Sequence, residues 1–182
     1  MTKTWKHPAL GEFTFDGYAW KTLVDAPAFK IFNYGHGRPP TGRVELSIPA
    51  DNESDLPPAD VLALISKVLA EQDRLVSAVT AALWDDFNGH GPYSGMWWHG
   101  HLGEVTQEVD PALPPLTSPD ALFRWMRLSA IEGRKSGRRN EMPAVELKFE
   151  APFEEEHGVG VLTDGISILG TGYSHDVGPF MK

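Results

Sequence analysis

The stretch that decides the fold is residues 52–89, NESDLPPADVLALISKVLAEQDRLVSAVTAALWDDFNG. Its apolar residues recur every three or four positions, which is typical of one face of an α-helix. Two prolines suit a first helical turn, and Asn88-Gly89 suits a helix end. The pattern predicts one helix from about Pro57 to Phe87, with only Gln72 interrupting the apolar stripe. Such a helix is long enough to cross a whole sheet.

Two carboxylates near the end of this predicted helix conflict with the helix dipole. Asp85 and Asp86 lie where the carbonyl ends of the helix carry partial negative charge. The pair therefore indicates either a site or an exposed, frayed last turn.

Short segments with strand-like alternation lie on both sides of the helix, separated by glycine and proline. The residue pair Asp164-Gly165 between two β-branched runs predicts a type I′ hairpin turn. A second, short helix is predicted from about Ser118, where serine, proline and aspartate follow one another. The expected strands are 11–17, 18–24, 28–34, 43–49, 103–109, 127–135, 144–153 and the two arms of 158–172.

These elements together predict a single α+β domain over residues 1–182. Its mainly antiparallel β-sheet is covered on one face by one long α-helix, and a second short helix completes it. A chain of 182 residues with 41% hydrophobic and 23% charged residues is long enough to bury a core.

Charge and composition restrict the possible partners. The net charge of −9 argues against nucleic acid, because phosphate binding needs a concentrated basic surface, and it favours encounter with a basic partner. One basic cluster, at Arg134, Lys135, Arg138 and Arg139, is either a solvated turn or a local anion site. No apolar run approaches the roughly 18 residues of a membrane span, and the N-terminal stretch has no apolar signal region, so we expect a cytoplasmic protein without membrane contact.

The familiar catalytic motifs are missing from the sequence. The chain has no cysteine, which excludes thiolate catalysis and cysteine-ligated zinc. It also has no Gly-x-Ser-x-Gly elbow and no phosphate-binding Gly-x-x-x-x-Gly-Lys loop. The glutamates at 154–156 are interpreted as a solvated face, and His157 as a residue that bonds backbone in a turn. Composition and motifs therefore favour a protein that binds over one that catalyses.

The segment Gly89–His101, GHGPYSGMWWHGH, leaves three interpretations open. Its histidines could hold a divalent metal such as zinc. Its aromatic residues could contact a partner. Alternatively, at least one tryptophan packs into the core and holds the loop, and we expect either Trp97 or Trp98 to be buried and the other partly exposed. The candidate metal ligands are His90, His99, His101 and His157, and the candidate partner-binding residues are Tyr93, Trp97 and Trp98.

The C-terminal run Glu156-His157-Gly158-Val159-Gly160-Val161, which leads into the final hairpin, resembles the closing segment of the DUF6985-like group of uncharacterised bacterial domains. The opening HPALGEFTFDGYAWKT, residues 7–22, is similar to their opening. Some related small domains look like immunity proteins of bacterial toxin systems. The resemblance implies the fold and a bacterial cytoplasmic setting, and it carries no catalytic residues.

From these patterns we predict a non-enzymatic bacterial interaction protein, immunity-like, with the loop 89–104 as part of its contact surface and a protein as its partner. The alternative is a small metal-binding protein or metal-dependent enzyme that uses the same histidine-containing loop. The interaction protein needs no cofactor, whereas the alternative needs a divalent metal.

Overall fold

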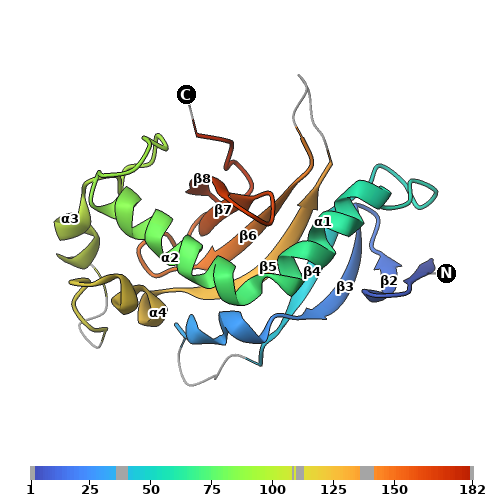
Figure 1. The fold of residues 1–182 in the computed structure, drawn as a ribbon, viewed down its shortest axis with the longest axis horizontal. Coiled ribbons are helices and arrows are strands. Elements are labelled where there is room, and N and C mark those ends of the chain that lie inside the picture. Colours follow the sequence, from blue (N-terminus) through green and yellow to red (C-terminus); the bar gives the residue numbers. More distant parts are fainter. Residues whose placement is uncertain (1–2, 36–40, 108, 110–112, 136–141, 181–182) are drawn as a thin grey trace.

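The structure, a computed structural model, describes residues 3–35, 41–107, 109, 113–135 and 142–180. It contains an eight-stranded sheet whose strands lie side by side in sequence order (Figure 1). Every neighbouring pair is antiparallel except β4 and β5, which are parallel. The predicted α+β class with a mainly antiparallel sheet is confirmed. The strands are β1 Thr4–His7, β2 Gly11–Phe15, β3 Ala19–Asp25, β4 Arg43–Pro49, β5 Arg127–Arg134, β6 Ala144–Glu150, β7 Val159–Thr163 and β8 Ile168–Tyr173.

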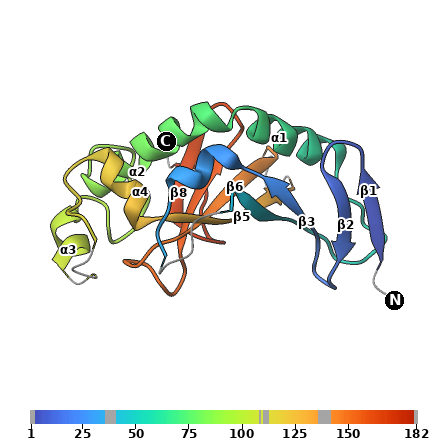
Figure 2. The ribbon, with the colours of Figure 1, turned by 90° about the horizontal axis from the view of Figure 1, so that it is seen from below.

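The parallel pair arises because the main helices lie between β4 and β5 in the chain. These helices run along one side of the sheet and leave the opposite side open (Figure 2). Helices α1 (Ala59–Ala70) and α2 (Gln72–Phe87) pack against β5, β6 and β8, and their apolar stripes form much of the core. Within the described residues no helix is long and apolar enough to cross a membrane. The helical elements are η1 Pro27–Ile31, α1 Ala59–Ala70, α2 Gln72–Phe87, α3 Leu102–Gln107, η2 Pro119–Ala121 and α4 Leu122–Trp125.

The long helix predicted from Pro57 to Phe87 is divided into α1 and α2 at Glu71. Gln72, which interrupts the apolar stripe, is the reason. Its side-chain amide donates to the carbonyl of Leu69 at 2.9 Å, and its side-chain oxygen accepts the backbone N–H of Ala28 at 2.9 Å. A side chain that bonds into the carbonyl ladder bends a helix. Leu69 beside the bend is only partly buried, while the stripe residue Ile65 is fully buried.

Two predicted strands are helical instead. The segment 28–34 contains η1, because Pro27 opens a helical turn and its two buried aromatic residues, Phe29 and Phe32, have helical spacing. The segment 103–109 overlaps α3. Val105 is its only buried residue among those whose burial is described, so the segment does not have the alternating buried positions that a strand needs. The edge strand β1 was not predicted. The short helix predicted from Ser118 is confirmed as η2 followed by α4.

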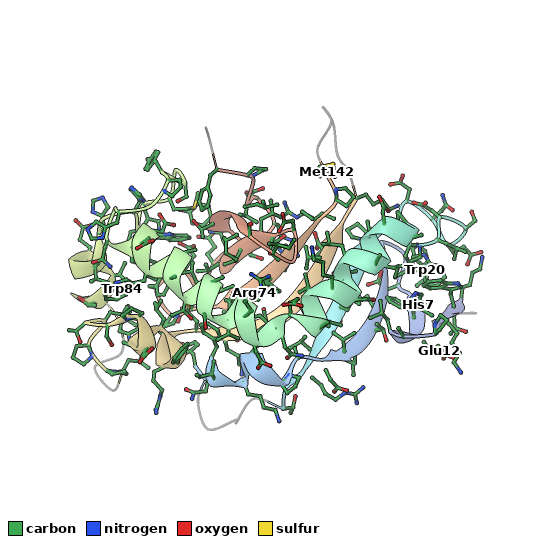
Figure 3. All side chains as sticks on the ribbon, viewed as in Figure 1. His7, Glu12, Trp20, Arg74, Trp84 and Met142 are labelled. Carbon is green, nitrogen blue, oxygen red and sulfur yellow. The ribbon has the colours of Figure 1, made fainter. Side chains whose placement is uncertain are left out.

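The final hairpin forms where the sequence predicts it, but the predicted turn type, I′, is wrong. Thr163 pairs with Ile168, so four residues form the turn. Gly165 has φ +77°, while Asp164 is not in the left-handed region that a type I′ turn requires at both positions. Instead, the Asp164 carboxylate accepts the backbone N–H groups of residues 166 and 167, at 2.8 and 2.7 Å. Arg74 of α2 donates to the carbonyls of residues 165 and 166 and joins the turn to the helix (Figure 3).

Candidate functional site

The loop after α2 is built around one buried carboxylate, that of Asp86. Its side chain is 2% exposed and accepts hydrogen bonds from Trp98 Nε1 at 2.8 Å, Thr171 Oγ1 at 2.8 Å and Ser94 Oγ at 3.1 Å. The Nδ1 atom of His99 lies 2.7 Å from Asp86 Oδ1. These partners offset the unfavourable position of an anion at a helix end. The interpretation of a frayed, exposed last turn is therefore wrong for Asp86.

The two adjacent tryptophans of the loop have different environments, as predicted. Trp98 is fully buried and meets Phe87, Phe153 and Tyr173 edge to face, which leaves it no surface for a partner. Trp97 is 40% exposed, and its Nε1 donates to Glu154 Oε2 at 2.9 Å. Tyr93 is exposed as well, and its ring packs edge-on against His99. Trp97 and Tyr93 are thus the aromatic residues of this loop that a partner can reach.

The candidate metal ligands lie apart in separate pairs. The Nδ1 atoms of His99, His101 and His157 face the carboxylates of Asp86, Glu104 and Glu154, at 2.7, 3.2 and 3.0 Å, and His90 is exposed. In the part of the chain that the structure describes, no group of three or more histidine, aspartate or glutamate side chains is arranged to hold a metal ion. Metal binding by these residues stays an alternative prediction.

The open face of the sheet carries polar side chains in two rows that the strand register defines. In one row, Lys21, Ser47, Glu132 and Glu146 are successive partners across β3 to β6. In the other, Glu45, Ala130, Lys148 and Gly160 are successive partners across β4 to β7. Partners in register point to the same face. Small residues at the centre of the rows, with long charged ones around them, leave room above the sheet.

The C-terminal segment closes one end of this open face. A side chain at Gly170 would collide with the backbone of Gly178, and one at Gly172 would press on Val177. These glycines let residues 174–180 lie directly on the sheet, where Val177 forms a small second core with Leu162 and its neighbours. The turn between β8 and this segment places His175 beside the charged rows.

The result is a hollow of about 830 Å³ on the open face. Its walls come from β3 to β6, from the turn at residues 154–158 and from the turn that holds His175. Seven carboxylates and two ammonium groups line it. Arg127 and Arg134 pair with two of these carboxylates, Glu150 and Glu132, from outside the lining, and carboxylates still outnumber the cationic groups, so the field is negative. The volume lies within the range of ligand sites, and the sign of the field selects a cationic ligand.

Buried ion pairs form the floor of the hollow. Lys148, 7% exposed, places Nζ 2.6 Å from Glu132 Oε2 and 2.9 Å from His175 Nδ1. Because an ammonium group only donates, His175 Nδ1 is the acceptor in this pair. His175 has φ +75°, and its backbone is fastened by Glu146, which accepts its N–H, and Arg134, which donates to its carbonyl. A strained backbone held in this way is common at functional sites.

The acidic turn at one wall joins the hollow to the loop after α2. Glu154 is buried, and it accepts Trp97 Nε1 and faces His157 Nδ1. The hydrogen bond to Glu154 raises the pKa of His157 above its usual value, and the nearby Glu156 and Asp176 add to the effect against some desolvation. Burial and Glu154 raise the pKa of Tyr173, whose ring packs at a tilt against that of His157. The Glu154 and His157 interpretations from sequence, a solvated face and a backbone contact, are both wrong.

The basic cluster divides between two environments. Arg134 binds the buried Glu146, and Lys135 pairs with Asp55 at 2.6 Å, so neither is a free solvated charge. Arg138 and Arg139 lie outside the described residues.

The sequence analysis named His157 and the glutamates at 154–156, which line the hollow, but it missed Ser47, Lys148 and His175. The alternation in β4 and β6 was the available signal, because polar residues there face away from the apolar ones. No pattern in the sequence places His175 against β6, since that contact depends on the C-terminal segment folding back.

Comparison with known proteins adds no relative to this geometry. No protein-family model matches the chain, and no curated protein and no solved structure shows significant similarity to it. The likeness of the C-terminal run to the DUF6985-like group therefore stays a prediction.

Proposed function

We propose that the chain is a non-enzymatic interaction protein that binds a basic protein partner in the acidic hollow. The observation that carries the proposal is the lining of the hollow, with seven carboxylates against two ammonium groups on an open sheet face. The net charge of −9 acts in the same direction at long range, because it speeds the encounter with a cationic surface.

Exposed aromatic residues at the edge of the hollow support a protein partner. Tyr18, 84% exposed, lines the hollow, and Trp97 bonds the wall residue Glu154. Tyrosine and tryptophan are enriched among residues that dominate binding energy at protein interfaces. The loop 89–104 contributes Trp97 to this surface, with Tyr93 further along it. In the immunity-like interpretation, the partner is a basic toxin domain.

A capture experiment with charge variants tests the proposal. The immobilised chain is exposed to lysate of its source organism at low salt, and bound proteins are identified by mass spectrometry. The test variant carries Glu45→Gln, Glu155→Gln and Glu156→Gln. These three exposed carboxylates of the hollow are called its rim carboxylates. The control carries Glu53→Gln, Asp73→Asn and Asp85→Asn, which are exposed and outside the hollow, and it loses the same charge.

The expected result is a specific basic protein that the wild type and the control capture, that the test variant loses, and that high salt releases. Equal capture by the test and control variants would contradict the proposal. Capture that chelator abolishes would favour the metal-dependent alternative instead.

A further inference from the structure

Ser47 is a buried hydroxyl without a partner in the described part of the chain. Its side chain is 9% exposed, lies on the open face of β4 and lines the hollow. Its Oγ forms no hydrogen bond with another described residue. Among the described residues, every polar side-chain atom that is sealed from solvent has a hydrogen-bond partner, so an unpartnered Oγ must be in contact with solvent. Ser47 Oγ therefore opens onto the hollow. A hydroxyl that faces the hollow without a partner among the described residues is free to accept a hydrogen bond from a group that enters from outside.

The surroundings of Ser47 identify the charge of that group. Its partners in register are Lys21 and Glu132, and Glu45 is two residues away on the same face. Lys21 is already shared between Asp16 and Glu45, at 3.1 Å from each. Glu132 is paired with Lys148 at 2.6 Å and with Arg134 at 3.7 Å. With Glu146, which Arg134 also binds, four carboxylates here face three cationic side chains, so the set keeps one net negative charge that an added cation would balance.

The shape of the position selects between the two basic side chains. A single hydroxyl acceptor between separate carboxylates suits a compact ammonium group, which donates in three directions. A guanidinium group prefers parallel acceptors in one plane.

We propose that the floor of the hollow binds a primary ammonium group, supplied by a lysine side chain of the basic partner, with Ser47 Oγ as acceptor and Glu45 and Glu132 as its counter-charges. The inference rests on the proposed function, since it names the group of the partner that enters the hollow.

Calorimetric titration with tetralysine tests the site. The variants are Ser47→Ala and, as the matched control, Ser66→Ala on α1, whose hydroxyl bonds the carbonyl of Leu62 on the helix side. We expect Ser47→Ala to weaken tetralysine binding about tenfold, the effect of one hydrogen bond to a charged group, and Ser66→Ala to leave it unchanged. Tetraarginine should lose much less on the same substitution.

The unfolding temperature separates a binding role from a structural one. Because Ser47 Oγ has no partner in the described residues, Ser47→Ala should melt at or above the temperature of the wild type. Glu45→Gln, an exposed change, should also weaken tetralysine binding without unfolding the protein. A lower melting temperature for Ser47→Ala, equal tetralysine affinity in both serine variants, or no tetralysine binding by the wild type would each overturn the inference.

These outcomes are distinct from failure of the proposed function. If capture of the basic partner depends on the rim carboxylates but tetralysine ignores Ser47, the function stands and the lysine site is wrong. If tetralysine depends on Ser47 but capture ignores the rim carboxylates, the ammonium site stands and the protein-partner function is wrong.

Discussion

At the scale of single residues, Asp86 organises the segment that the sequence left most ambiguous. One carboxylate holds Trp98, Thr171, Ser94 and His99, and so ties the loop after α2 to β8. The aromatic residues of the loop are positioned by this contact, which explains why one tryptophan is buried while its neighbour reaches the acidic turn.

Substitution of Asp86 should destabilise the fold strongly. Asp86→Ala leaves the indole N–H of Trp98 and the hydroxyl of Thr171 buried without an acceptor, which should cost about 3 kcal/mol in the free energy of unfolding. Asp85→Ala, at the exposed neighbouring position, should change it by less than about 0.5 kcal/mol. Urea denaturation measures both, and similar losses in the two variants would show that Asp86 does not hold the loop.

His157 should show a pH dependence of defined sign. Its pKa in the folded protein lies above the usual value of 6.5, mainly because Glu154 accepts its hydrogen bond, with Glu156 and Asp176 also near the ring. The stabilisation is therefore complete below about pH 6.5 and is lost as the pH rises through the folded-state pKa.

Proton NMR of the histidine rings follows this titration directly. The pKa of His157 should fall toward its usual value in Glu154→Gln, and His157→Gln should flatten the loss of stability that begins as the pH rises above about 6.5. A His157 pKa that Glu154→Gln leaves in place would assign the shift to a different cause.

At the scale of elements, the periodicity of apolar residues predicted most of the structure. The strands β2 to β8 lie where alternation or a β-branched run indicates them, apart from small shifts at their ends. The errors arise where a short segment has few residues to define a period, as at η1 and α3. The division of the long helix has a different origin, because it depends on Gln72 reaching Ala28, a contact that only the folded chain forms.

The bend between α1 and α2 should depend on the Gln72 side chain. Gln72→Leu keeps a similar shape but leaves the N–H of Ala28 without its acceptor and the carbonyl of Leu69 without its donor, which should cost about 1–3 kcal/mol. Asp73→Ala at the exposed next position is the control. Thermal and urea unfolding report the difference, and a Gln72→Leu protein as stable as the control would mean that packing alone sets the bend.

At the scale of the whole molecule, the layer of helices makes the two faces of the sheet different. One face forms the core against α1 and α2 (Figure 2). The other face holds the hollow. The sequence predicted that helical residues cover one face, and the expectation of a basic partner, drawn from the net charge, stays a prediction. It did not predict the hollow, because the hollow requires the strand register and the folding back of residues 174–180 over glycines, neither of which a local pattern specifies.

The most direct measurement of the central claim is a hydroxyl-radical footprint of the chain, free and in complex with the partner captured through the rim carboxylates. Two exposed aromatic residues should lose reactivity in the complex, namely Tyr18, which lines the hollow, and Trp97, which bonds its wall residue Glu154. Met142, 80% exposed and outside the hollow, should keep its reactivity (Figure 3). If Tyr18 and Trp97 react equally in the free and bound chain while Met142 is protected, the partner binds elsewhere and the acidic hollow is not the functional surface.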